Sequence, residues 1–313
     1  MTRGVAAVTG ATGFLGQHLV RALSDDGWRV RVLARRAPVS PFWAGIEPEV
    51  VIGNLEDEAA LARVCAGAGL VAHAAGLIAG SASQLRRVNV EGGRRLAVAA
   101  WKHAPGARTL LISSLAAREP QLSAYAASKR AGEEAALEVL GDAAVVVRPP
   151  AIYGPGDRET LRIFQAAARS PVLPVLDPRA RIALIHVEDA ARQIIALAQM
   201  QKSGCGPMGL CDERPEGYAW RELMQTVAAV LGRPRRLLRI PAGALSALAA
   251  VDMLGNGWRR RTATLTFGKV RELTHLDWGI QPHERAPGAP AAVFDLRAGF
   301  EHTVAWYRKS AWL

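Results

Sequence analysis

The sequence is poor in cysteine and has no long hydrophobic run. Its 313 residues include only three cysteines, Cys65, Cys205 and Cys211, without CxxC spacing, which argues against a disulfide framework or a zinc site. No uncharged apolar run approaches the ~18–20 residues of a membrane-spanning helix, and the N-terminus lacks the pattern of an export signal. We therefore expect no metal and a location in the reducing cytoplasm.

Negative charge is also in deficit, because the formal net charge is +11. The arginines occur as scattered short clusters at 35–36, 235–236 and 259–261, with no long basic tail and no nucleic-acid-binding motif. Such clusters usually form a solvated face, although a few arginines can bind a phosphate. We expect no nucleic-acid partner.

Apolar β-branched segments alternate with segments of helical periodicity over the first two thirds of the chain. This order predicts an α/β fold with a doubly wound parallel sheet covered by helices on both faces. The predicted strands are 4–10, 29–35, 49–55, 70–76, 109–114 and 143–149, and the main helices are 14–27, 56–68, 88–104 and 125–140.

The texture changes after Pro149 and Pro150, where loops rich in proline and glycine interrupt the alternation. The stretch 181–199 reads as one more strand and helix that return to the sheet. We therefore predict a dinucleotide-binding Rossmann domain (1–152 and 180–202) and a smaller, discontinuous substrate-binding lobe (153–179 and 203–313).

The segment "VTGATGFLG" places Gly10, Gly13 and Gly16 after the first strand and at the start of a helix. A pyrophosphate needs a tight turn, close approach of the backbone and a helix N-terminus. The strand before and the helix after the motif supply the required context, so the segment predicts a bound dinucleotide.

The end of the second strand indicates which dinucleotide binds. An NAD site usually places a carboxylate there for the ribose 2′-hydroxyl, whereas this sequence has Ala34 followed by Arg35 and Arg36. Two guanidinium groups suit a 2′-phosphate better. NADP is therefore favoured, and NAD stays open.

Seven motifs in a fixed order carry a family resemblance. The segments "TGATGFLG", "GNLED", "AHAAG", "NVEGG", "ISS", "YAASK" and "RPPAIYGPGD" resemble the extended short-chain dehydrogenase/reductase family of NAD(P)-dependent epimerases, dehydratases and reductases. The resemblance covers roughly residues 4–190. The chain end is more loosely similar to relatives of 3β-hydroxysteroid dehydrogenase and dihydroflavonol reductase.

The resemblance implies a catalytic set of Ser114, Tyr125 and Lys129, in which Ser113 could substitute for Ser114. A free tyrosine has a pKa near ~10 and is a poor base, but a lysine one helical turn away favours its phenolate. Tyr125 would then exchange the substrate proton, Lys129 would also hold the nicotinamide ribose, and Ser114 would hydrogen-bond the substrate oxygen.

The same resemblance implies a set of residues around the cofactor and a structural role for Asn89. His73 and His186 lie on strands and are interpreted as structural. The implied cofactor-binding residues are Gly10, Thr12, Gly13, Phe14, Leu15, Arg35, Arg36, Asn54, Leu55, Ala74, Ala75, Gly76, Ser113, Tyr125, Lys129, Pro149 and Ile152.

Departures from the family pattern narrow the function. Leu115 and Ala116 stand where dehydratases carry an Asp-Glu pair, and Ala151 replaces an asparagine common in sugar-nucleotide enzymes. The leading hypothesis is an NAD(P)-dependent oxidoreductase that acts on a carbonyl or secondary alcohol of a small, fairly apolar substrate. A nucleotide-sugar epimerase and a non-catalytic NADP-binding sensor or assembly protein are the alternatives.

Two partner questions stay open. The first is whether the chain forms a homodimer, because helix-paired homodimers are common in the resembling family. The stretch "AGALSALAAVDMLGNGWRRR", an apolar segment followed by arginines, suits a peripheral membrane contact, although such stripes more often pack in a core.

Overall fold

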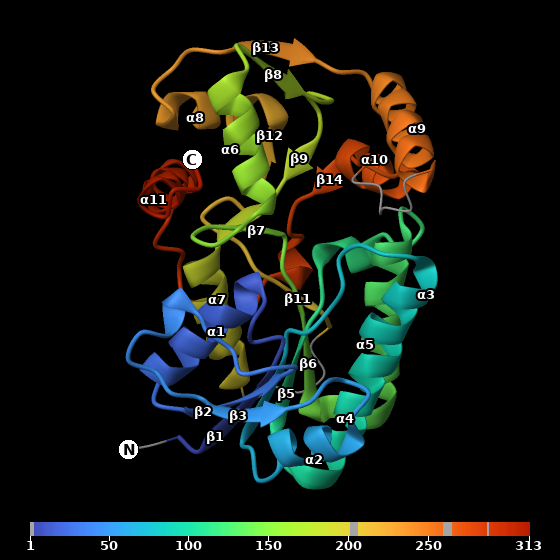
Figure 1. Ribbon diagram of the computed structural model, residues 1–313, viewed down its shortest axis with the longest axis vertical. Coiled ribbons are helices and arrows are strands. Elements are labelled where there is room, and N and C mark those ends of the chain that lie inside the picture. Colours follow the sequence, from blue (N-terminus) through green and yellow to red (C-terminus); the bar gives the residue numbers. More distant parts are fainter. Residues whose placement is uncertain (1–2, 201–205, 259–264, 287) are drawn as a thin grey trace. The chain divides into compact units, whose positions relative to one another are not determined.

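The computed structural model describes residues 3–200, 206–258, 265–286 and 288–313, and Cys205 lies outside them. Its main sheet has seven strands in the order β11-β6-β5-β4-β1-β2-β3, all parallel (Figure 1). The predicted doubly wound parallel sheet is therefore confirmed. The strands are β1 (Val5–Thr9), β2 (Arg29–Ala34), β3 (Glu49–Ile52), β4 (Leu70–His73), β5 (Arg108–Ile112), β6 (Ala144–Arg148) and β11 (Met208–Gly209).

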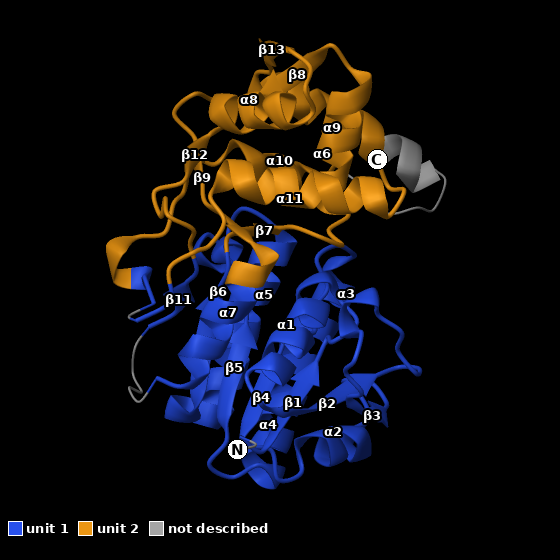
Figure 2. Ribbon diagram, turned by 90° about the vertical axis from the view of Figure 1, so that its left-hand side faces the viewer, with its two compact units in different colours: residues 1–149, 190–210, 284–290 blue, residues 150–189, 211–283, 291–313 orange. Residues whose placement is uncertain are grey.

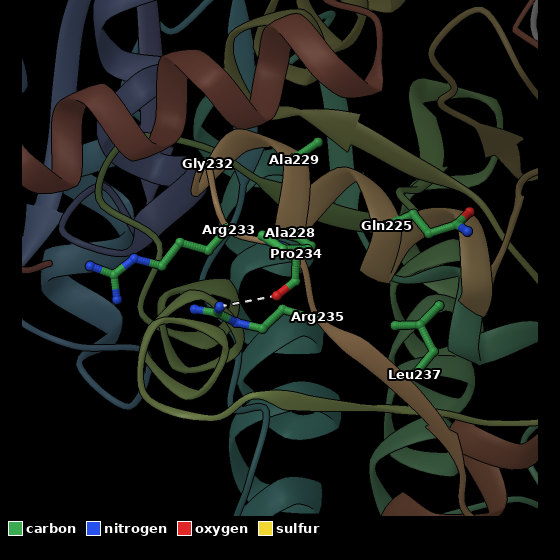
Figure 3. Close-up of a pocket in the computed structure, with 8 residues that line it drawn as sticks. All are labelled: Gln225, Ala228, Ala229, Gly232, Arg233, Pro234, Arg235 and Leu237. Carbon is green, nitrogen blue, oxygen red and sulfur yellow. Dashed lines mark hydrogen bonds between the residues drawn. The ribbon is translucent and has the colours of Figure 1, made fainter.

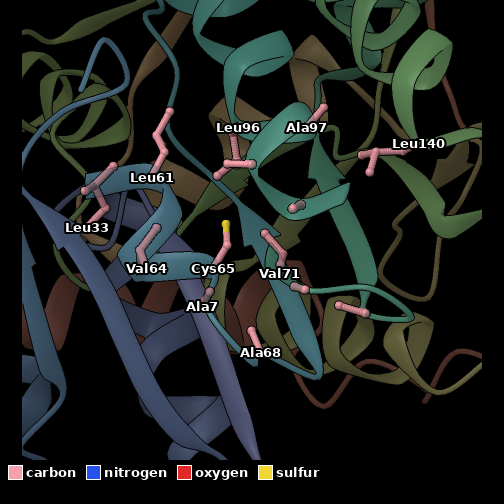
Figure 4. Packing of buried hydrophobic residues seen from close by; sticks show 14 of the residues in the cluster. Ala7, Leu33, Leu61, Val64, Cys65, Ala68, Val71, Leu96, Ala97 and Leu140 are labelled. Atoms are coloured by element: carbon pink, nitrogen blue, oxygen red, sulfur yellow. The ribbon is translucent and has the colours of Figure 1, made fainter. Parts of the chain in front are cut away.

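Helices cover both faces of this sheet. On one face, α2 (Glu58–Cys65), α4 (Gly93–His103) and α5 (Ala124–Leu140) lie together, and α1 (Phe14–Asp25) and α7 (Val187–Ala198) lie on the other (Figure 1). The strands β1 and β4 are buried along their whole length, as expected for a sheet covered twice. Small and branched side chains such as Ala7, Val71 and Leu96 interdigitate with α2 in the core (Figure 4).

The helical region before α4 differs from the prediction. The sequence predicted a single helix over 88–104, but helical structure begins at α3 (Ala82–Leu85), where Ser81 and Gln84 form a capping box. A π-helical segment η2 (Arg86–Gly92) then leads into α4. Wide turns of this kind are rare and occur frequently at functional sites, and periodicity alone does not reveal them.

The prediction that 181–199 returns to the main sheet as one more strand and helix was wrong for the strand, whereas the helix α7 does lie on a face of that sheet. Strand β10 (Leu184–His186) pairs in parallel with β7 (Ala151–Tyr153) in a separate two-stranded sheet, and β11 takes the seventh place beside β6. Since Pro149 and Pro150 have no backbone N–H to donate, the β6 ladder ends at Arg148 and β7 starts a new one.

The chain divides into two compact units (Figure 2). Unit 1 comprises 1–149, 190–210 and 284–290, and unit 2 comprises 150–189, 211–283 and 291–313. No described helix has both the length and the apolar composition needed to cross a membrane. The 3₁₀ helices are η1 (Pro41–Trp43), η3 (Leu115–Arg118), η4 (Gly141–Ala143) and η5 (Pro282–Glu284).

Unit 2 has its own hydrophobic core, in which Tyr153, Phe164, Phe300 and Tyr307 pack with edge-to-face ring contacts. Its short strands form two- and three-stranded sheets. The elements are α6 (Glu159–Arg169), β8 (Val172–Val175), β9 (Arg181–Ile182), β12 (Tyr218–Ala219), α8 (Trp220–Val230), β13 (Arg236–Arg239), α9 (Ala242–Trp258), α10 (Phe267–Thr274), β14 (Asp277–Trp278) and α11 (Leu296–Lys309).

Candidate active site

The glycine-rich turn joins β1 to α1. Gly10 has a φ of 76°, and a Cβ there would overlap the backbone of Ala74 and Ala75 at the end of β4, so the turn is built for glycine. Gly13 is the N-cap of α1, and no side chain caps the helix. The first-turn N–H groups of Phe14 and Leu15 are thus left for an anion, which fits the diphosphate of a dinucleotide.

The polar groups predicted to bind the adenosine side of the cofactor lie at the ends of β2 and β3. Arg35 and Arg36 follow β2 directly, are exposed, and form no ion pair with another described residue. Asn54 follows β3 and is exposed, and its side-chain oxygen accepts a hydrogen bond from the Glu56 N–H at 2.7 Å. The Asn54 amide N–H groups therefore stay available as donors.

The Lys129 ammonium group lies over the carboxyl ends of β4 and β5. Its Nζ donates a 2.8 Å hydrogen bond to the Ile112 carbonyl, the last of β5, and a Cβ at Gly76 would lie 3.6 Å from Nζ. Parallel α/β sheets bind their ligands beyond these strand ends. Tyr125 is half-buried one turn earlier on α5, so the predicted pair shares one helix face.

The two serines after β5 differ in their surroundings. Ser114 Oγ accepts a 3.2 Å hydrogen bond from the Ala116 N–H and begins η3. Ser113 Oγ is buried without a hydrogen-bond partner among the described residues. It lines a cavity of about 20 Å³ that also touches His73, Asn89 and Lys129, which is room for about one water molecule.

A hydrogen-bond network connects the cofactor strand to α5. Asn89, on the π-helical segment, exchanges two hydrogen bonds with the backbone of Leu77, at 2.7 and 2.9 Å, and donates to Ser128 Oγ at 2.9 Å. Ser128 in turn donates to the Tyr125 carbonyl at 2.8 Å. The sequence reading placed Asn89 near the site but missed Ser128, because only the fold brings residues 39 positions apart into contact.

A buried ion pair adjoins Lys129 and was also missed. Glu133, one turn further along α5, accepts two hydrogen bonds from Arg148 at 2.9 and 2.6 Å, and both side chains are buried. Burial lowers the pKa of Lys129 to about 8, while the negative charge of Glu133 raises it. Glu133 therefore acts electrostatically on a lysine whose pKa lies within reach of neutral pH.

Both strand histidines are hydrogen-bonded. His73 Nδ1 lies 2.7 Å from Thr9 Oγ1, and its pKa is lowered to about 3 by burial and then by the charge of Lys129. His186 Nδ1 accepts from the Glu188 backbone N–H, and its Nε2 lies 3.2 Å from His302 Nδ1. Glu188 and His302 could join His186 around a metal ion, but the Nδ1 contact places the proton on Nε2, which favours the hydrogen bond.

The remaining predicted cofactor residues lie in two places. Pro149 follows β6 and accepts a 2.8 Å hydrogen bond from Leu115, whereas Ile152 lies on β7 in unit 2. In unit 1 the fold thus brings together the carboxyl ends of β1, β4 and β5, the start of α1 and one face of α5.

Comparison with known proteins identifies the family to which the chain belongs. Residues 6–207 match the model of the NAD dependent epimerase/dehydratase family. The chain belongs to this family. It is 53% identical over 316 residues to the ceramide reductase of Caulobacter vibrioides, covering 99% of this chain and 96% of the relative. It is also 28% identical to sterol demethylase protein B of Methylococcus capsulatus, covering 96% and 98%.

The fold is shared with solved structures as well. The crystal structure of gox2253 superposes with a TM-score of 0.77 at 22% identity and covers 99% of both chains. The predicted resemblance is therefore confirmed. The chain is an NAD(P)-dependent enzyme of the oxidoreductase and epimerase type.

Proposed function

We propose that this enzyme reduces a ketone on a ceramide-like, long-chain substrate, with NADPH as the hydride source. The 53% identity to the ceramide reductase, which extends over almost the whole chain, carries the substrate class. A ceramide has a secondary alcohol on its long-chain base, and this is the group that hydride transfer to a ketone produces.

Three side chains of unit 1 perform the proton chemistry in this proposal. The bound nicotinamide supplies the hydride for the carbonyl carbon. Tyr125 donates its phenolic proton to the carbonyl oxygen, and Ser114 Oγ hydrogen-bonds the same oxygen. Lys129, held by the Ile112 carbonyl, stabilises the phenolate that Tyr125 leaves behind. The pKa of about 8 keeps Lys129 largely protonated at neutral pH.

The test is NADPH turnover by the purified enzyme on a panel of ketones. We expect oxidation of NADPH with an oxo-ceramide, and a loss of ~10²–10⁴-fold in kcat for Tyr125→Phe with unchanged thermal stability. Rapid turnover of a nucleotide sugar without net cofactor oxidation would instead support an epimerase. Cofactor binding without turnover of any substrate would support a sensor or assembly role.

Cofactor choice is tested separately at the end of β2. In the proposal Arg35 and Arg36 bind the 2′-phosphate, so Arg35→Ala with Arg36→Ala weakens NADPH binding by at least ~10-fold, given ~1.5–3 kcal/mol for a charged hydrogen bond. NADH binding stays within about two-fold. The matched control is Arg29→Ala, which removes an exposed arginine at the opposite end of β2. Equal losses for both cofactors would contradict the assignment.

The cytoplasmic location stays a prediction from the sparse cysteines, and cell fractionation tests it.

A further inference from the structure

The helix α9 carries an apolar stripe on its exposed face. Ala244, Ala247, Leu248 and Val251 follow the i, i+3, i+4, i+7 spacing of one helix face and are all exposed, Leu248 by 55% and Val251 by 69%. Ala249, off this stripe, is fully buried. A helix of a globular protein normally packs its apolar stripe against the core. An apolar stripe that is exposed instead marks a surface that can bind a partner.

The neighbouring two-stranded sheet also exposes apolar side chains. In the β8–β13 register, Val172 is opposite Arg236 and Pro174 is opposite Leu238. Side chains alternate along a strand, so these four share one face of the sheet, and all four are exposed, Leu238 by 60%. Only two residues separate β13 from α9, and Figure 1 shows the strand leading directly into the helix.

Positive charge accompanies this surface. Between residues 233 and 253 the sequence has four arginines and one acid, Asp252, whose carboxylate accepts a hydrogen bond from the Leu265 N–H at 2.8 Å. Arg233 and Arg236 make no side-chain hydrogen bond or ion pair with the described residues.

The other two arginines of the segment are engaged. Arg235 donates to the carbonyls of Ala167 and Pro234, and Arg239 lies 3.8 Å from Asp177. The charges left for a partner are therefore those of Arg233 and Arg236.

A groove of about 390 Å³ lies where α8 ends and β13 begins. Figure 3 shows the apolar side chains of Ala228, Pro234 and Leu237 on its lining. Two arginines also line it: Arg235 donates a hydrogen bond to the Pro234 carbonyl, whereas no hydrogen bond is drawn to the Arg233 guanidinium. Because Leu237 alternates with Arg236 and Leu238 along β13, this groove lies on the other side of the sheet from their exposed face.

We propose that α9 and the exposed β8–β13 face form a membrane-docking surface for bilayers that contain anionic phospholipids. Leu248 and Val251 enter the boundary between headgroups and acyl chains, and Arg233 and Arg236 contact lipid phosphates. The sequence alone favoured core packing for this stretch, which holds for Ala249 but not for the exposed Leu248 and Val251, and the arginines at 259–261 lie outside the described residues. The inference rests on the surface of unit 2 and holds whatever the substrate is.

Sedimentation of the full-length chain with lipid vesicles tests the proposal. We expect binding to vesicles of 30% phosphatidylglycerol in phosphatidylcholine and weaker binding to pure phosphatidylcholine. The double variant Leu248→Glu with Val251→Glu weakens binding to the phosphatidylglycerol-containing vesicles by more than ~10-fold. Arg233→Gln with Arg236→Gln removes most of the difference between the two vesicle types, at roughly five-fold per arginine, and raised salt does the same.

The control variant is Val39→Glu with Trp101→Glu, which places two acids on exposed apolar positions of unit 1 and leaves vesicle binding unchanged. The arginine variant alters only exposed side chains and tests the surface even if the glutamate variant fails to fold. Wild-type protein that binds neither vesicle type would overturn the proposal. So would a glutamate variant that binds normally, or one that only lowers the oligomeric state in light scattering, which would identify the stripe as an interface between copies.

Reductase activity is read in parallel on a water-soluble short-chain ketone without vesicles. The glutamate variant keeps this activity if the surface serves docking alone. A loss of vesicle binding with intact turnover supports the docking surface, whereas absent turnover in the wild-type protein bears only on the proposed reaction.

Discussion

At the residue scale, Glu133 influences the pKa of Lys129 without itself taking part in the proposed reaction. The Glu133→Gln variant removes the negative charge that raises the pKa of Lys129, so this pKa falls further below about 8. The alkaline limb of the kcat/KM profile therefore moves to lower pH. A displacement of one unit from pKa 8 lowers the protonated fraction at pH 8 by about five-fold, and a pH–rate profile measures it.

The same variant leaves Arg148 buried without its partner, which costs roughly 3–5 kcal/mol of folding stability. The double variant Glu133→Leu with Arg148→Met separates the two effects. Replacing both buried charges with apolar side chains restores most of the stability, whereas the alkaline limb stays displaced. If the double variant also recovered the original pH profile, the influence of Glu133 on Lys129 would be refuted.

At the scale of elements, features contained in a short segment could be predicted from the sequence, whereas the pairing of distant segments could not. Gly10, Gly13 and the Tyr125–Lys129 spacing are recognisable because their chemistry is contained in a few consecutive residues. The pairing of β10 with β7 and the contact of Asn89 with Ser128 depend on how distant segments meet, which periodicity does not encode. The π-helical segment was missed because its wide turn breaks the 3.6-residue period.

The packing of α5 against the π-helical segment gives a prediction at this scale. Gly132 lies where a Cβ would overlap the Asn89 carbonyl, so Gly132→Ala forces the two elements apart. We expect a loss of roughly 1–3 kcal/mol in stability and a lower kcat, because Lys129 lies on the preceding turn of α5.

The matched control for Gly132→Ala is Gly243→Ala on α9, where nothing lies within 4 Å of the added Cβ. A helical Gly→Ala change without a clash stabilises by roughly 0.4–1 kcal/mol. Urea denaturation of the two variants should therefore show opposite signs, and an equally stable Gly132→Ala protein would rule out the steric argument.

At the scale of the whole molecule, the stability of the protein depends on a histidine that stays neutral. Burial, together with the smaller effect of the Lys129 charge, lowers the pKa of His73 to about 3 in the folded state, whereas the unfolded chain binds this proton at about pH 6.5. Between these values the unfolded state holds more protons, so the free energy of unfolding decreases as pH falls. Above pH ~6.5 the contribution of His73 to stability is complete.

We expect His73 to account for roughly 1–3 kcal/mol of the stability lost between pH 7 and pH 4.5. In the His73→Asn variant, the amide can still hydrogen-bond Thr9 but cannot titrate, so its urea-denaturation midpoint falls less steeply with acid than that of the wild-type protein. The control His103→Asn replaces an exposed histidine of the same unit and keeps the wild-type slope. Because carboxyl groups contribute equally to all three proteins, the difference in slope isolates His73, and parallel slopes for wild type and His73→Asn would show that the buried ring is protonated well above pH 3.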